Sequence, residues 1–154
     1  MTLQELLERR KLAPKETTAQ EVGDLMHLAE QYLADAQVET ISPDLRFTAA
    51  YQAALQLATI PLHCAGYRPV GDGRHITVFQ ALPLTMGEEQ NAAAGYYDVC
   101  RRKRHEAEYR RVGQISEHEV SELVSTVGDF LSDVREWLAV NHPDLVGEQR
   151  DSGL

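Results

Sequence analysis

The chain has 154 residues, 43% of them hydrophobic, which suits one folded domain that needs no metal or disulfide support. Only three Phe and one Trp accompany many Ala and Leu, so the composition favours a helical core over a β-sandwich. The formal net charge of −9 argues against a dedicated duplex-binding domain, which normally has a basic balance throughout. Cys64 and Cys100 have no CxxC or paired histidine spacing, so we expect two reduced, mostly buried thiols.

The first seventeen residues predict a short helical arm, residues 1–17. Its sequence TLQELLERRKL places Leu at helical spacing among charges and has no long apolar run. We therefore expect neither a secretory signal nor a membrane span. With the reduced cysteines, this pattern predicts a cytoplasmic protein without a membrane partner.

Helix signals recur along the rest of the chain. Thr18 begins a capping box and an apolar stripe that predict a helix over about 18–37. Ser42 and Pro43 predict the start of a second long helix, which Pro61 should kink or restart. The Pro- and Gly-containing segment 68–75 predicts a loop.

Three further helices follow that loop. The segment ITVFQALPL has strand-forming residues, but no second convincing strand pairs with it, so we predict a short helix ending at Gly87. Glu88 and Glu89 suit the first turn of a long helix that ends at Gly113. Ser116 begins another capping box, and a regular apolar spacing continues from there to Leu138.

These elements predict an all-α, up-and-down bundle of four long helices plus a short fifth. The bundle should span residues 18–142, and the polar segment 143–154 should form a frayed tail. No internal repeat or low-complexity tract interrupts it.

The most informative segment for function is RRKRHEAEYRR, residues 101–111, which holds six of the fifteen Lys and Arg residues. On a helical wheel, Tyr97, Arg101, Arg104, Glu108 and Arg111 form one stripe, with His105 and Tyr109 beside it. One interpretation is a solvated helix face on which Arg104 and Glu108 form a weak surface pair. The other is a phosphate-binding face, because the planar fork of arginine matches phosphate oxygens.

The order of RFTAAYQAAL, a Gly-containing loop, GRHITVFQAL and YYDVCRRKRHEAEY resembles the HEPN superfamily of small prokaryotic helical domains. The resemblance covers roughly residues 18–140. In such proteins the loop often ends in a histidine, here His75 after Arg74, and the next long helix carries an arginine, a polar residue and a histidine. The resemblance implies a metal-independent ribonuclease, in which two protomers form a cleft, the arginine steadies a phosphate and the histidine transfers protons.

Transferred residue by residue, the resemblance makes Arg104 the arginine and His105 the polar residue, and it places Tyr109 where the histidine stands. It implies catalytic roles for these three and phosphate binding by Arg101, Arg102 and Arg111. Tyrosine, with a pKa of about 10, is a poor base at neutral pH, so His105 would have to substitute from a different geometry. Three other Arg–His pairs, each with six residues between, satisfy a loose version of the motif but span a loop or a helix end: Arg68 with His75, Arg111 with His118, and Arg135 with His142.

No cofactor loop is evident, and we predict no metal site, because His118 and Glu122 have no evident third ligand. Two functions remain open. The first is an RNA-directed domain of toxin–antitoxin or defence type, either a ribonuclease with an altered site or a binder that has lost cleavage. The second is a non-catalytic module that pairs with another protein, for which the resemblance suggests a nucleotidyltransferase-like or antitoxin partner that modifies a tyrosine such as Tyr109. In either case the resemblance implies a homodimer.

Overall fold

The computed structural model describes residues 1–109 and 113–146, with side chains for all of these except 107–109. Its elements are α1 (Leu3–Glu8), β1 (Leu12–Pro14), α2 (Ala19–Asp35), α3 (Pro43–Cys64), β2 (Tyr67–Pro69), α4 (Arg74–Met86), the 3-10 turn η1 (Glu88–Gln90), α5 (Asn91–Tyr109), α6 (Glu117–Asn141) and the 3-10 turn η2 (Pro143–Leu145). The predicted all-α bundle, with four long helices and a shorter α4, is confirmed.

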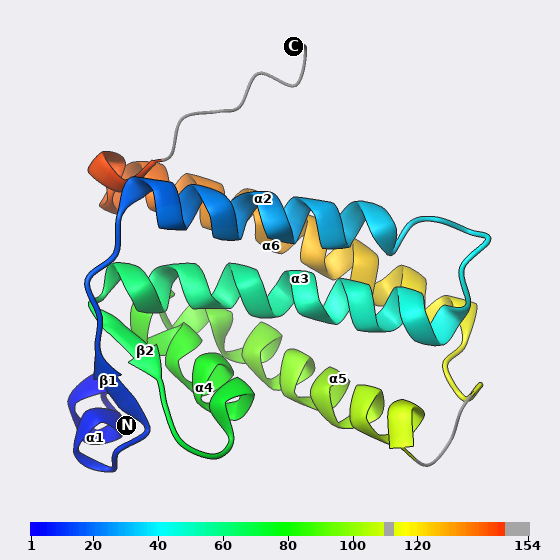
Figure 1. Ribbon diagram of the computed structural model, residues 1–154, viewed down its shortest axis with the longest axis horizontal. Helices are drawn as coiled ribbons and strands as arrows, with labels where there is room; N and C mark the ends of the chain where they lie inside the picture. Colours follow the sequence, from blue (N-terminus) through cyan, green and yellow to red (C-terminus); the bar gives the residue numbers. More distant parts are fainter. Residues whose placement is uncertain (110–112, 147–154) are drawn as a thin grey trace.

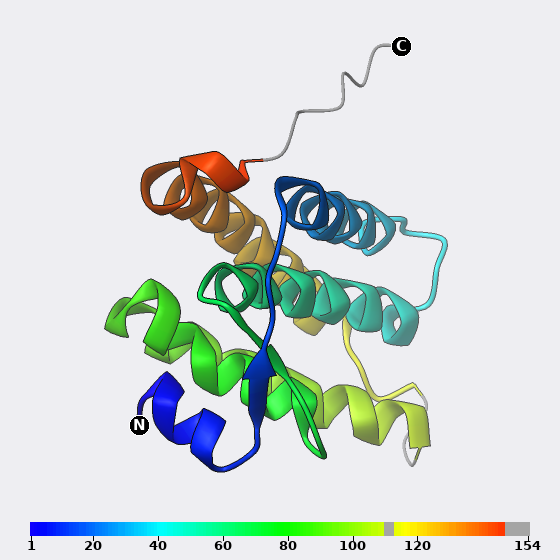
Figure 2. The same ribbon diagram turned by 60° about the vertical axis from the view of Figure 1, so that its left-hand side comes forward.

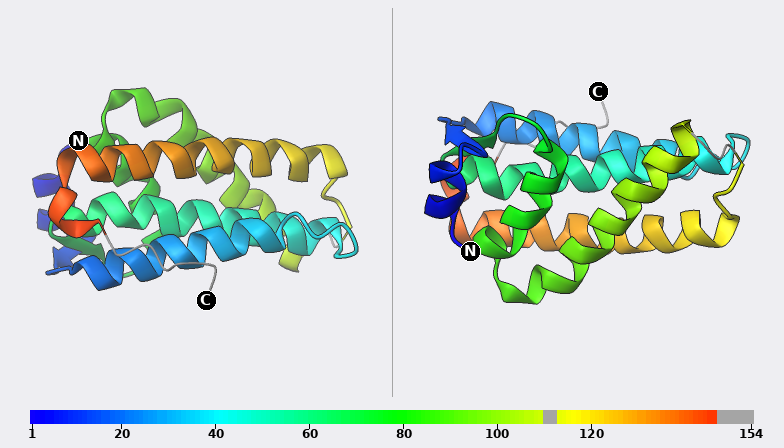
Figure 3. Two further views of the ribbon diagram at one scale, coloured as in Figure 1. Left: turned by 90° about the horizontal axis from the view of Figure 1, so that it is seen from above. Right: turned by 90° about the horizontal axis from the view of Figure 1, so that it is seen from below.

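The long helix α3 is the centre of the bundle and contacts α2, α4, α5 and α6 (Figure 1). Helices α2 and α6 pack on one side of α3, and α4 and α5 lie on the other (Figure 2). Seen from below, α4 and α5 run across α2, α3 and α6, which lie side by side (Figure 3). Within the described ranges, no helix combines the length and the apolar character that crossing a membrane requires.

The predicted helix starts are confirmed by their capping contacts. The side-chain oxygens of Thr18, Ser42 and Ser116 each accept a hydrogen bond from the backbone N–H three residues on. Each bond satisfies one of the N–H groups that a helix start leaves without an intrahelical partner. At Ser116 the side chain of Glu119 also accepts from the Ser116 N–H, which completes the capping box.

Of the two outcomes predicted at Pro61, a kink or a restart of the second helix, the restart does not occur. Helix α3 continues through Pro61 to Cys64, and Ile60, Pro61 and Leu62 are all buried. The proline removes one N–H donor, but apolar burial along this turn offsets that loss. Two residues separate the end of α3 from β2, and β2 is followed by α4.

Two short strands were not predicted. Antiparallel pairing of β1 with β2 sets Leu12 opposite Pro69 and Pro14 opposite Tyr67. Strand β1 lies in the predicted arm, and β2 begins one residue before the predicted loop 68–75. Three-residue strands are too short to show an alternating pattern, and a proline lies in each. Because Leu6 and Leu12 are buried in the common core, the first seventeen residues pack against the bundle.

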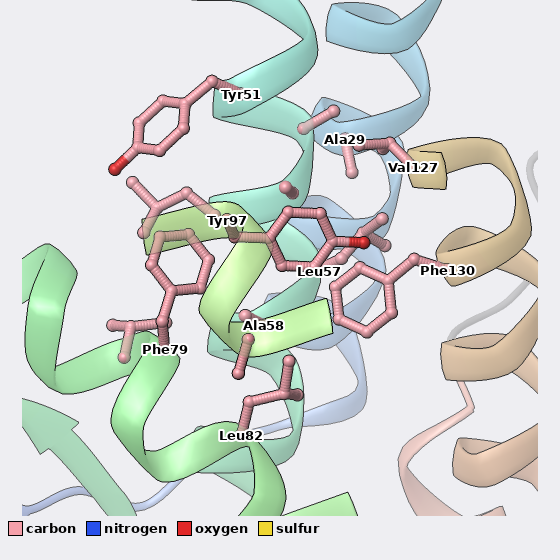
Figure 4. Close-up of a cluster of buried hydrophobic side chains, with 14 of the residues drawn as sticks. Ala29, Tyr51, Leu57, Ala58, Phe79, Leu82, Tyr97, Val127 and Phe130 are labelled. Atoms are coloured by element: carbon pink, nitrogen blue, oxygen red, sulfur yellow. The ribbon is translucent and has the colours of Figure 1, made fainter. Parts of the chain in front are cut away.

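Aromatic rings fill the space between α4, α5 and α6. Tyr97 lies between Phe79 and Phe130 (Figure 4), with ring centroids 5.6 and 5.3 Å away. Its ring is fully buried, so the prediction that Tyr97 shares a polar stripe with the basic residues is wrong. Burial at this position fixes which face of α5 turns outward.

The start and end of α5 differ in part from prediction. Gly87 ends α4 as expected, but Glu88 and Glu89 belong to η1 rather than to the first turn of α5. Helix α5 is described as far as Tyr109. The predicted helix end at Gly113 follows residues 110–112, which lie outside the described residues. Cys64 and Cys100 are free thiols, partly and fully buried, as expected.

Candidate phosphate-binding pocket

A pocket of about 270 Å³ lies where the start of α4 meets the middle of α5. Its lining residues are Gly73, Arg74, His75, Ile76, Arg101, Arg104 and His105. One wall is therefore a helix N-terminus and the other is a basic helix face. Both features favour a negatively charged ligand.

The turn before α4 depends on glycine. Gly71 and Gly73 have φ angles of 73° and 72°, in the left-handed region that costs other residues energy. Gly73 is the N-cap and supplies no side-chain oxygen, so no side chain caps the first N–H groups of α4. The positive end of the helix dipole consequently points toward the pocket without a carboxylate cap.

The α5 wall follows from helical spacing. Arg101, Arg104 and His105 stand at positions i, i+3 and i+4, which place them on one helix face. Tyr97, one turn before Arg101 on the same face, is buried in the core. Three of the six predicted site residues, all from this segment, therefore lie together in the pocket.

A buried tyrosine of α3 forms the floor of this arrangement. The guanidinium carbon of Arg104 lies 5.0 Å from the centre of the Tyr51 ring, within the range of a cation–π contact. The Tyr51 hydroxyl oxygen and His75 Nδ1 are 2.8 Å apart and hydrogen-bonded. Tyr51 thereby contacts one residue from each wall and fixes their relative positions.

Burial and the arginines set the protonation states in the pocket. Burial lowers the pKa of His75, and the positive charges of Arg104 and Arg101 lower it further. The imidazole is therefore mostly neutral at pH 7. Burial raises the pKa of Tyr51 well above its usual range, against the opposing effect of the two arginines, so the hydroxyl keeps its proton.

Carboxylates partly neutralise the basic residues in and beside the pocket on α5. Arg101 Nε donates to Asp98 at 2.9 Å, so its charge is shared with a carboxylate at the pocket edge. Lys103 pairs with Glu119 of α6 at 2.7 Å, which raises the pKa of the lysine and lowers that of the glutamate. Arg102 is exposed, 3.9 Å from Asp98, and is not among the pocket residues.

Two predicted site residues fall outside this description. Tyr109 ends α5, but its side chain lies outside the described part, and so does Arg111. The expected surface pair of Arg104 with Glu108 also involves a side chain, that of Glu108, outside the described part. Among the described residues, no group of three or more His, Cys, Asp or Glu side chains is placed to hold a metal ion.

Sequence reasoning did not select His75 and Tyr51 as site residues. His75 had one signal, because the resemblance already indicated a histidine at the end of the loop. Tyr51 had none, since a tyrosine in an Ala- and Leu-rich helix is typical of a core residue. Both come from segments that are remote from α5 in the chain, and only the packing of α3, α4 and α5 brings them together.

The fold and this pocket define an all-α helical bundle with a basic site between two of its helices. The family model described as SAV_6107-like HEPN matches residues 36–135, about two thirds of the chain. The chain therefore belongs to the SAV_6107-like HEPN family, and the predicted membership of the HEPN superfamily is confirmed. No curated protein and no solved structure matches it.

Proposed function

We propose that this HEPN domain binds RNA in the pocket between α4 and α5 and cleaves its backbone without a metal ion. The observation that carries the proposal is the convergence of Arg101, Arg104 and His105 with the open N-terminus of α4. Two guanidinium groups and the N–H groups of a helix start are donors that suit a phosphodiester. HEPN membership supports RNA as the phosphate-bearing ligand in this proposal, and we propose a role in a toxin–antitoxin or defence system.

In this proposal Arg104 binds the phosphate and stabilises the charge that develops during cleavage, and Arg101 assists it. His105 supplies acid–base chemistry in place of the histidine that the family motif has at Tyr109. In this proposal the pocket holds only the reacting phosphate of the RNA. The flanking nucleotides extend along the exposed α5 face.

The test is cleavage of total tRNA and a mixed single-stranded RNA pool in EDTA, followed on a gel. We expect Arg104→Ala to lower the cleavage rate by about 100-fold or more, because a donor aimed at developing charge contributes on that scale. His105→Ala should also lose activity. Arg135→Ala is the matched control, since it removes an exposed arginine that pairs with Glu30 on the far side of α3.

Wild-type protein that leaves every RNA intact, or an Arg104→Ala variant as active as Arg135→Ala, contradicts the proposal. The variants are compared at equal folded fraction, measured by circular dichroism, because Arg104 also contacts the buried Tyr51.

The second candidate is a non-catalytic module that binds a nucleotidyltransferase-like or antitoxin protein. Two observations favour it: the net charge of −9, and the sharing of Arg101 with Asp98, which reduces the positive charge offered to RNA. A protein that shows no cleavage and no RNA binding, but copurifies with the product of a neighbouring gene, supports this candidate over the first.

A further inference from the structure

The pocket contains a second histidine, His75, which has no role in the proposed function. His75 stands in the first turn of α4 and faces the basic side chains of α5. His75 belongs to α4, whereas the motif residues belong to α5. Its position relative to Arg104 therefore depends on the packing of the two helices. Its position opposite His105 gives the pocket two imidazoles on two walls.

We propose that His75 is the general base of the site, taking the proton of the ribose 2′-hydroxyl, and that Tyr51 positions its ring for this step. The inference rests on the proposed ribonuclease function and assigns the base that the motif lacks at Tyr109. His75 is the catalytic residue in this proposal, and Tyr51 is a positioning residue that acts through it.

The hydrogen bond to Tyr51 occupies Nδ1 of His75, so Nε2 is the ring nitrogen that we propose reacts. Tyr51 is fully buried, and its hydroxyl contacts Nδ1 of His75 at 2.8 Å. The proposed base form is the tautomer with its proton on Nδ1, in which Nδ1–H donates to the tyrosine oxygen and the lone pair on Nε2 is available for proton transfer. The contact also stabilises the imidazolium that forms, since Nδ1–H remains a donor after Nε2 is protonated.

Burial and the charges around His75 favour the neutral imidazole, the form that a general base requires. Tyr51 faces it from α3, Arg101, Arg104 and His105 face it from α5, and Arg74 precedes it on α4. Burial and the arginines lower its pKa, so the neutral form predominates at pH 7. Among the described residues no carboxylate lines the pocket, and Asp98 at its edge is paired with Arg101. Binding of a phosphate anion offsets the arginine charges and makes the protonated product easier to form.

The reaction balances with the groups present. Nε2 of His75 takes the 2′-hydroxyl proton while the 2′-oxygen attacks the adjacent phosphorus. The bond from phosphorus to the 2′-oxygen forms, the bond to the 5′-oxygen breaks, and protonated His105 gives its proton to the leaving 5′-oxygen. The products are a 2′,3′-cyclic phosphate and a 5′-hydroxyl end. Exchange of protons with water then resets both histidines.

The experiment measures kcat and KM against pH for a short fluorogenic RNA in EDTA, and binding of the same RNA with 2′-O-methyl riboses. We expect kcat/KM of the wild type to fall as the pH drops through the His75 pKa, below about 6.5. His75→Ala should lower kcat by about 100-fold or more and lose this acidic limb, because positioned acid–base groups contribute on that scale. It should bind the methylated RNA within about threefold of wild type.

Added imidazole separates a chemical role from a structural one. Imidazole should restore part of the His75→Ala activity, which a purely structural defect does not allow. Tyr51→Phe keeps the ring under Arg104 and removes only the hydroxyl. We expect it to lower kcat by about three- to tenfold, the worth of one hydrogen bond, with KM unchanged and the acidic limb displaced. His118→Ala and Tyr32→Phe, which lie outside the pocket, are the matched controls.

If His75→Ala does not fold, His75→Asn replaces it, because its amide N–H can still donate to Tyr51. A His75 variant that cleaves at the wild-type rate with the same acidic limb overturns this inference and leaves the ribonuclease proposal standing. A wild-type protein that binds the RNA but never cleaves it overturns both the cleavage and the role of His75. A wild-type protein that does neither overturns the proposed function itself.

Discussion

Tyr51 and Tyr97 are both fully buried, but their hydroxyl groups have different surroundings. The Tyr51 hydroxyl is hydrogen-bonded to His75, whereas the Tyr97 hydroxyl forms no hydrogen bond with the described residues. Burial raises the pKa of Tyr97 far above its usual range, so this hydroxyl remains a neutral polar group in an apolar cluster. A buried hydroxyl without a partner lowers the stability of the folded state.

We therefore expect Tyr97→Phe to raise the free energy of unfolding by about 1 kcal/mol, because it removes an unsatisfied polar group and keeps the ring. Urea unfolding of the two proteins under identical conditions measures the difference. Leu123→Ala, a cavity-forming change in the same core, should instead cost about 2 to 5 kcal/mol. A Tyr97→Phe protein that loses more than about 1 kcal/mol contradicts this account and reveals a hydrogen bond to this hydroxyl.

Individual residues also show where sequence reasoning stops. Arg101, Arg104 and His105 were predicted from helical spacing and from the family resemblance, and helix geometry places them near one another on α5. Tyr97 satisfies the same spacing but is turned into the core. The wheel gives relative angles around the axis, and it does not show where the boundary between core and solvent falls.

At the scale of elements, Arg46 of α3 links the end of α2 and the start of α6 through hydrogen bonds. Arg46 of α3 is mostly buried; its Nε donates to the carbonyl of Ala36 after α2 at 2.8 Å, and its Nη1 donates to Glu117 of α6 at 2.7 Å. Beside it, the Asp44 carboxylate accepts from the Gly113 N–H at 2.7 Å. These contacts fix where α6 begins relative to α3.

We expect Arg46→Ala to lower the free energy of unfolding by about 2 to 3 kcal/mol, since a buried carbonyl loses its donor and the packed side-chain stem is removed. Arg135→Ala, which removes an arginine from an exposed ion pair, should cost under about 1 kcal/mol. Thermal or urea unfolding compares the two variants with the wild type. Equal losses in both variants contradict the assigned role of Arg46.

The caps made most of the helix starts predictable, because Ser and Thr act locally on the next turn. The strands were not predictable, because the pairing of β1 with β2 joins segments more than fifty residues apart and leaves no local pattern. The continuation of α3 through Pro61 likewise depends on burial against distant helices.

At the scale of the whole molecule, the charge distribution matters most for function. An overall charge of −9 repels RNA at long range, so binding has to depend on positive groups within a few ångströms of a phosphate. The pocket between α4 and α5 gathers such groups on one face of the bundle. The fold class was predictable from composition and periodicity. The pocket was not, because α4 and α5 come together only through their packing on α3. The homodimer remains a prediction.

The most direct test of the central claim, that the pocket holds an RNA phosphate, is the salt dependence of binding to a 2′-O-methyl RNA that cannot be cleaved. Each phosphate contact on a single strand contributes about −0.7 to the slope of log K against log salt concentration. We predict that Arg104→Ala weakens binding and makes the slope shallower by about 0.7, while Arg135→Ala leaves both unchanged. An Arg104→Ala protein with the affinity and slope of the wild type would contradict the account.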